Sequence, residues 1–200
     1  MLRALLIMLC LVPGLAKADA RAHLELFAQG LETLSGDFRQ VVFDSDGFAL
    51  EESTGRLFFQ APDRFRWNYA EPFPQQLVAD GERMWHYDEG LEQVTVREQP
   101  DAGESALLVL TRPDLLERFY SVKPSGLPDE LHFVPLDEQA GFEHASLRFV
   151  DGRPAALEFI DRVVGQITLI ELNNLERNPD LDPALFQFVP PPGVDVLEGY

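Results

Sequence analysis

The chain has 200 residues, enough for one domain with a substantial core, and 34 acidic against 16 basic residues give a net charge of −18. This charge argues against binding to nucleic acid or to an anionic membrane, because both favour a basic surface. Cys10 is the only cysteine, so no disulfide can form within the chain and the fold must depend on packing.

The first 18 residues have the pattern of a cleavable secretory signal peptide. Arg3 supplies a basic start, residues 5–12 form an apolar run too short to cross a membrane, and Ala16-Lys17-Ala18 is a typical cleavage motif. The cysteine lies inside the apolar run, which argues against lipidation. We therefore expect an exported protein with a single domain, residues 19–200, and a net charge of −20 after Arg3 and Lys17 are removed with the signal.

A helix is predicted over residues 20–34. Leu24, Phe27, Leu31 and Leu34 follow helical spacing, and polar side chains occupy the other faces. Ser35-Gly36 is a plausible end of this helix.

From Asp37 to Arg97 the hydrophobic period changes to two, which predicts an antiparallel meander. Asp44-Ser45-Asp46-Gly47 and Asp80-Gly81 predict hairpin turns. We interpret the first of these as a turn rather than a calcium loop, because the remaining ligands and flanking helices are missing. Gly55 predicts a bend or a bulge.

The segment from Arg56 to Arg97 contains both tryptophans of the chain. By alternation, large apolar side chains recur on one face of its strands and polar ones on the other. We expect the first group to face a ligand (Leu57, Phe59, Phe65, Trp67, Trp85 and Tyr87) and the second group to face water (Arg64, Arg66 and His86).

Two short helices, 105–111 and 113–120, interrupt the strands, and Pro113 suits the first turn of the second helix. The first helix is apolar on nearly every face, so it must be buried on several sides or cover a cavity. Strands resume at 131–134, and Asp151-Gly152 predicts a further hairpin. About ten short strands and few helices indicate a mainly β fold, a sandwich or a barrel.

No catalytic constellation stands out in the sequence. The four histidines are widely spaced, and we find no nucleophile elbow and no glycine-rich phosphate loop. A glycosidase-like carboxylate pair stays open among 34 acids, although no pattern favours one. We expect a protein that is not an enzyme and uses no metal or cofactor.

The 15 phenylalanines and two tryptophans permit two interpretations. They form a well-filled core, or they line an open barrel that binds a hydrophobic ligand. The export signal, the missing catalytic groups and the apolar helix favour the second interpretation.

Four blocks of sequence resemble the LolA family of periplasmic outer-membrane lipoprotein carriers. They are LFFQAPDRFRWNY (57–69), LVADGERMWHY (77–87), LEQVTV (91–96) and FVPPPGVDV (188–196). The first two resemble the family patterns L-x-x-x-R-P-x-x-F-x-W and S-D-G-x-x-x-W-x-Y. Their order, after an export signal, makes the resemblance specific over nearly the whole mature chain.

The resemblance implies an α+β fold, an incomplete antiparallel β-barrel or half-pipe, with covering helices as a lid over a hydrophobic cavity. It implies a periplasmic, monomeric chaperone. Such a carrier accepts lipoproteins from an inner-membrane ABC transporter, shields their acyl chains and delivers them to the outer-membrane receptor LolB. LolB itself shares the fold but requires a lipobox, which this signal lacks. A binder of another lipid or peptide tail and an exported hydrolase are the rival hypotheses.

By the same resemblance, Phe65 and Trp67 lead the candidate cavity residues, and Leu107, Leu108 and Leu110 are the candidate lid residues. Ala61 departs from the family, whose members usually have an arginine there that hydrogen-bonds the lid backbone and favours the closed, empty state. We therefore hypothesise that this lid is held by apolar contacts alone and opens more readily.

Overall fold

A computed structural model describes residues 19–99, 108–138 and 140–199 of the chain. The predicted signal peptide with Cys10 and the candidate lid residue Leu107 lie outside the described residues.

The chain enters the fold through helix α1 (Ala20–Ala28). Asp19 caps it by accepting a hydrogen bond from the backbone N–H of Ala22 at 3.0 Å. The helix ends well before residue 34, where the prediction was wrong, because Gln29 is extended and Gly30 adopts a φ of 66°. Leu34 instead belongs to the first strand, where its side chain is completely buried.

Twelve strands of the described chain form one open sheet in the order β12-β6-β5-β4-β3-β2-β1-β11-β10-β9-β8-β7. All neighbours are antiparallel except the parallel pair β12–β6. The strands are β1 (Thr33–Phe43), β2 (Ala49–Gln60), β3 (Arg64–Glu71), β4 (Gln75–Ala79), β5 (Arg83–Asp88), β6 (Gln93–Glu98), β7 (Tyr120–Pro124), β8 (Glu130–Pro135), β9 (Phe142–Val150), β10 (Arg153–Asp161), β11 (Ile167–Arg177) and β12 (Asp195–Glu198).

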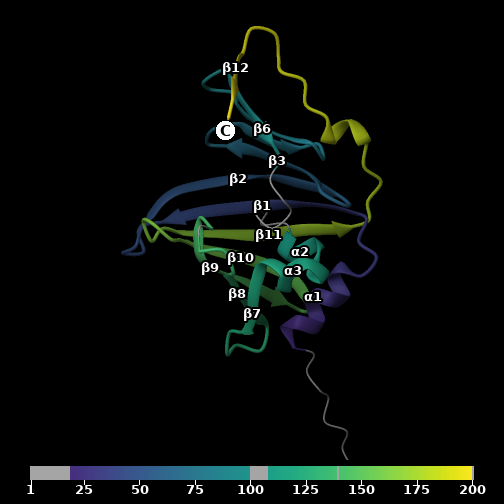
Figure 1. Cartoon of the computed structure of the whole chain (residues 1–200), viewed down its shortest axis with the longest axis vertical. Coiled ribbons are helices and arrows are strands. Elements are labelled where there is room, and N and C mark those ends of the chain that lie inside the picture. The colour runs from purple at the N-terminus through teal and green to yellow at the C-terminus, as the bar shows by residue number, and fades with distance from the viewer. Residues whose placement is uncertain (1–18, 100–107, 139, 200) are drawn as a thin grey trace, which may run out of the picture.

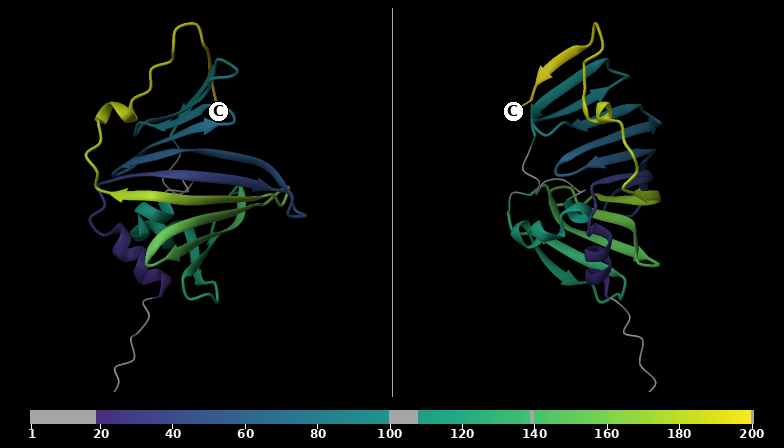
Figure 2. Two further views of the ribbon diagram at one scale, coloured as in Figure 1. Left: turned by 180° about the vertical axis from the view of Figure 1, so that it is seen from behind. Right: turned by 90° about the vertical axis from the view of Figure 1, so that its right-hand side faces the viewer.

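The prediction of a mainly β, incomplete antiparallel barrel is confirmed, and the alternative of two packed sheets is wrong. Figure 1 and Figure 2 show the sheet curving without closing. The predicted hairpin turns at Asp80-Gly81 and Asp151-Gly152 join β4 to β5 and β9 to β10. Their glycines have φ values of 101° and 73°, which other residues adopt only with strain.

Gly55 forms the predicted bulge, since the β2–β3 register shifts between Thr54 and Gly55. A Cβ atom on Gly55 would lie 2.0 Å from the carbonyl oxygen of Asn68 and 2.7 Å from the ring of Phe38. Only glycine therefore lets the two strands and the Phe38 ring approach this closely.

Three helices lie against one face of the β7–β11 half of the sheet (Figure 1). We call this the inner face. Helices α2 (Leu108–Thr111) and α3 (Pro113–Phe119) follow the gap in the described chain, and α3 begins at Pro113 as predicted. Arg21 of α1 forms a 3.1 Å ion pair with Glu117 of α3, which links the helices to one another.

The C-terminal segment crosses the opposite, outer face of the β3–β6 half (Figure 2). Its short 3₁₀ helix η2 (Pro183–Phe186) buries Phe186 almost completely. The guanidinium of Arg66 on β3 donates to the carbonyl oxygen of Leu185 at 3.0 Å, so Arg66 is half-buried against this segment rather than facing water as predicted. The sequence pattern also missed β7 and β12, which form the two edges of the sheet.

Candidate functional site

The apolar cluster of the inner face includes four side chains of β2 and β3. The register pairs Leu57 with Trp67 and Phe59 with Phe65, so these four side chains share one face, as their alternation predicts. They are 0–8% exposed. The Phe38 ring packs edge-on against Trp67, with the ring centroids 4.8 Å apart.

Side chains of the helices belong to the same buried cluster as these four residues. Leu110 of α2 and Leu116 of α3 are completely buried in the same cluster as Phe65 and Trp67. Leu108 is the first residue of α2, and Leu107 lies outside the described residues. Because the cluster is buried, a ligand can reach it only if part of this packing moves.

The turn between β2 and β3 approaches the joint between α2 and α3. Ala61 is exposed in this turn, and its N–H donates to the carbonyl oxygen of Glu32 at 2.8 Å. The hydrogen bond to Asp114 foremost, with a contribution from Asp63 in the turn, raises the pKa of Arg112. Asp63 is thus an acidic group of the turn that attracts Arg112 from a distance, whereas position 61 itself offers no side-chain hydrogen bond.

Trp85 and Tyr87 lie on the outer face, so the prediction that they face the same side as Phe65 is wrong. Their rings pack against Phe188 of the C-terminal segment at centroid distances of 5.6 and 5.9 Å. The register explains the reversal, because Ala79 pairs with both Phe65 and Met84. Alternation separates two faces of a strand but does not say which face is inner.

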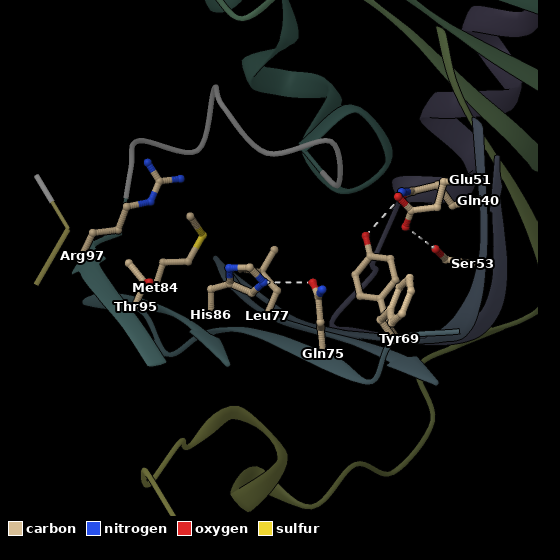
Figure 3. A pocket seen from close by; sticks show the side chains of 11 residues that line it. Gln40, Glu51, Ser53, Tyr69, Gln75, Leu77, Met84, His86, Thr95 and Arg97 are labelled. Carbon is tan, nitrogen blue, oxygen red and sulfur yellow. Dashed lines mark hydrogen bonds between the residues drawn. The ribbon is translucent and has the colours of Figure 1, made fainter. Parts of the chain in front are cut away.

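Met84 and His86 therefore occupy the inner face of β5, where they line a groove of about 420 Å³ (Figure 3). The groove follows β1–β6 beyond the helical cover, and polar side chains outnumber apolar ones along it. Its lining consists of Gln40, Glu51, Ser53, Tyr69, Phe73, Gln75, Leu77, Met84, His86, Thr95 and Arg97. The prediction concerned only the apolar face of these strands, so the groove was missed. On β5 and β6 the polar half of the alternation was the signal for it.

Hydrogen bonds organise the polar groups of the groove (Figure 3). The Tyr69 hydroxyl donates to Oε1 of Gln40 at 3.2 Å, and Nε2 of His86 lies 3.0 Å from Oε1 of Gln75. Burial, followed by the charge of Glu51, raises the pKa of Tyr69, so this hydroxyl stays protonated at neutral pH.

Neither a metal cluster nor a membrane-spanning helix is found in the described part of the chain. Residues 19–99, 108–138 and 140–199 contain no group of three or more His, Cys, Asp or Glu side chains that could hold a metal ion. Within these ranges no helix combines the length and apolar character needed to cross a membrane.

The family model of the outer membrane lipoprotein carrier protein LolA matches residues 29–189. The chain belongs to the LolA family. It is 44% identical to the outer-membrane lipoprotein carrier protein of Alkalilimnicola ehrlichii over 98% of this chain and 92% of that protein. The corresponding protein of Halorhodospira halophila is 40% identical over 97% of this chain and 93% of its own length. Carriers of this family are periplasmic and are not enzymes.

Among solved structures, the fold is similar to that of an uncharacterised conserved protein from Thermus thermophilus. The TM-score is 0.55 at 15% identity, and the match covers 88% of this chain and 95% of the other. At this identity the likeness concerns the fold alone.

Proposed function

We propose that this LolA-family protein carries outer-membrane lipoproteins across the periplasm with their acyl chains buried against its inner face. The observation that carries the proposal is the continuous apolar cluster of the inner face, to which β1–β4, β8–β11 and the three helices all contribute. Family membership supports the same function.

The physical need for such a carrier follows from the cost of exposing acyl chains. Each CH₂ group returned to water costs about 0.8 kcal/mol, so a lipoprotein with several chains cannot cross an aqueous gap unaided at a useful rate. The carrier needs only to bury the chains reversibly, which requires no chemistry at the site.

We assign the acyl-chain contacts to Leu57, Phe59, Phe65 and Trp67. These side chains are buried in one cluster with Leu110 and Leu116, and we propose that loading moves α2 and α3 and releases Leu110 from the cluster. Acyl chains then replace the apolar contacts that the helices made. Leu107 and Leu108 belong to the same proposed lid.

The proposal includes a route. Residues 1–18 direct export and are then cleaved, and the mature protein functions as a monomeric single domain over 19–200. It receives cargo from an inner-membrane ABC transporter and releases it to LolB. The expected direction of transfer requires that the carrier bind acyl chains more weakly than the final acceptor does.

The decisive experiment is incubation of the mature protein with a triacylated lipoprotein and the inner-membrane transporter. A soluble one-to-one complex of carrier and lipoprotein is expected. Phe65→Ala should reduce its yield, whereas Phe48→Ala, at a position 69% exposed in the β1–β2 turn, should not. Failure of the parent protein to form this complex, or its recovery with free lipid only, overturns the proposal.

A further inference from the structure

We propose that the polar groove over β1–β6 is a second binding subsite. It takes the ester and amide groups that join the acyl chains to the cargo polypeptide, together with the first peptide units behind them. This inference rests on the proposed function and adds to it a division of the inner face into two parts of different chemistry.

The groove combines the apolar side chains of Phe73, Leu77 and Met84 with polar groups along its whole length. Its walls present the hydroxyl groups of Ser53, Tyr69 and Thr95 and the amides of Gln40 and Gln75. An acyl chain laid over these groups would remove them from water without offering a hydrogen bond, which is costly. Ester and amide groups can use the hydrogen-bonding capacity that the internal bonds Tyr69–Gln40 and His86–Gln75 leave free.

The groove is continuous with the apolar cluster. Tyr69 follows Trp67 on the same face of β3, and Leu77 pairs with Trp67 across β3 and β4. Tyr69, Leu77 and Met84 line the groove and also pack against the buried cluster. One ligand can therefore lie with its apolar part under the helices and its polar part in the groove without crossing a barrier.

The groove carries opposite charges at its two ends (Figure 3). Glu51 lies at one end of the groove and Arg97 at the other, as Figure 3 shows, and amides, hydroxyls and an imidazole lie between them. The centre thus suits a neutral ligand rich in dipoles. A free fatty acid, whose carboxylate seeks a cation, would be drawn instead toward Arg97.

The volume also fits a linkage rather than a full set of chains. About 420 Å³ lies near the lower end of the range for ligand pockets. The acyl chains themselves have their apolar surroundings under the helices.

The test compares two ligands on two variants. In the groove variant Gln75→Leu/His86→Leu, a synthetic triacylated lipopeptide should bind about ten-fold more weakly, because two hydrogen-bonding groups are lost. Palmitate should bind this variant as well as the parent or better. The control Gln76→Leu alters the neighbouring amide on the other face of β4, where Gln76 accepts from Arg66, and should leave both affinities unchanged.

Unchanged lipopeptide affinity in the groove variant, or an equal loss for lipopeptide and palmitate, overturns the inference. In that case lipopeptide binding by the parent would still support the proposed function, so the two failures are distinguishable. If the parent does not bind lipopeptide, both proposals fail.

A crosslinking experiment on the otherwise unaltered groove makes the test independent of whether the double variant folds. A benzophenone side chain placed at Thr95 should attach to the peptide or linkage part of the lipopeptide, as located by mass spectrometry. Attachment to the acyl chains alone contradicts the inference.

Discussion

The carboxylate of Asp80 determines how the β4–β5 hairpin turns. It accepts hydrogen bonds from the backbone N–H groups of Glu82 and Arg83 at 2.9 and 2.8 Å, and from the indole N–H of Trp85 at 2.9 Å. Partial burial acts to raise the pKa of Asp80, but these hydrogen bonds, led by that of Trp85, outweigh it and hold the pKa below its ordinary value. The ionised form is therefore favoured by folding.

We predict that Asp80→Ala lowers the free energy of unfolding by about 1–2 kcal/mol at pH 7, because three donors lose a charged acceptor that is partly exposed to solvent. A depressed carboxyl pKa stabilises the fold above the unfolded-state pKa, and this contribution disappears as the pH falls through the lower, folded-state value. The free energies of unfolding of parent and variant, measured with urea, should therefore converge as the pH falls below the ordinary pKa of an aspartate, near 4. This account would be contradicted if the difference in free energy of unfolding between parent and variant stayed constant down to pH 3. An equally large loss in the control Glu82→Ala would also contradict it.

At the bulge in β2, Gly55→Ala should destabilise the protein by about 1–3 kcal/mol, the usual range for overpacking. The added methyl group would meet the Asn68 carbonyl oxygen at 2.0 Å and the Phe38 ring at 2.7 Å, so strands and ring must move apart. Thermal unfolding measures the loss. Gly141→Ala is the matched control, since a Cβ there meets no atom within 4 Å; similar losses at both sites would show that the bulge does not require glycine.

Among the elements, the helical cover and the β2–β3 turn form the part of the fold that must move. Asp63 in the turn attracts Arg112 at the α2–α3 joint, whereas the alanine at position 61 offers no side-chain hydrogen bond. Because even an exposed ion pair contributes at most about 1 kcal/mol, this longer-range attraction latches the cover only weakly on this side.

We expect Ala61→Arg to slow opening of the helices by giving the turn a donor that reaches toward their backbone. Hydrogen exchange of residues 108–119 should become slower, and lipoprotein release to the acceptor should slow with it. Ala70→Arg, at an exposed position on β3, should change neither. Unchanged exchange and release in Ala61→Arg would rule out the hypothesis that the missing arginine loosens the lid.

The elements also show which parts of the fold can be predicted from the sequence alone. Turn residues such as Gly81 and the bulge at Gly55 were predictable, because their backbone geometry demands glycine. The end of α1 was not, because Leu31 and Leu34 fit a helical stripe and a buried strand equally well. The faces of Trp85 and Tyr87 were reversed, because they depend on strand register and on a C-terminal segment about 100 residues away that covers them.

For the site, the apolar set Leu57, Phe59, Phe65 and Trp67 could be predicted because the strands that carry it are adjacent and share one turn. The polar groove could not, since Gln40 and Arg97 approach it from strands far apart in the sequence. Only the tertiary pairing of six strands places these groups along one surface.

At the scale of the whole molecule, the sheet separates two aromatic environments. Trp67 is 6% exposed on the inner face, against Phe38 and near the helices. Trp85 is half-buried on the outer face, where Phe188 covers it. A ligand held on the inner face therefore has direct access to only one of the two tryptophans once the helices move.

This separation predicts which tryptophan reports binding. Addition of a triacylated lipopeptide should shift the fluorescence emission of the parent protein, and Trp85→Phe should retain the shift because Trp67 is still present. Trp67→Phe should lose most of it, although circular dichroism shows an intact fold. A shift that survives Trp67→Phe and disappears in Trp85→Phe would place the ligand on the outer face, beneath the C-terminal segment, and would contradict the assignment of the inner face as the acyl-chain site.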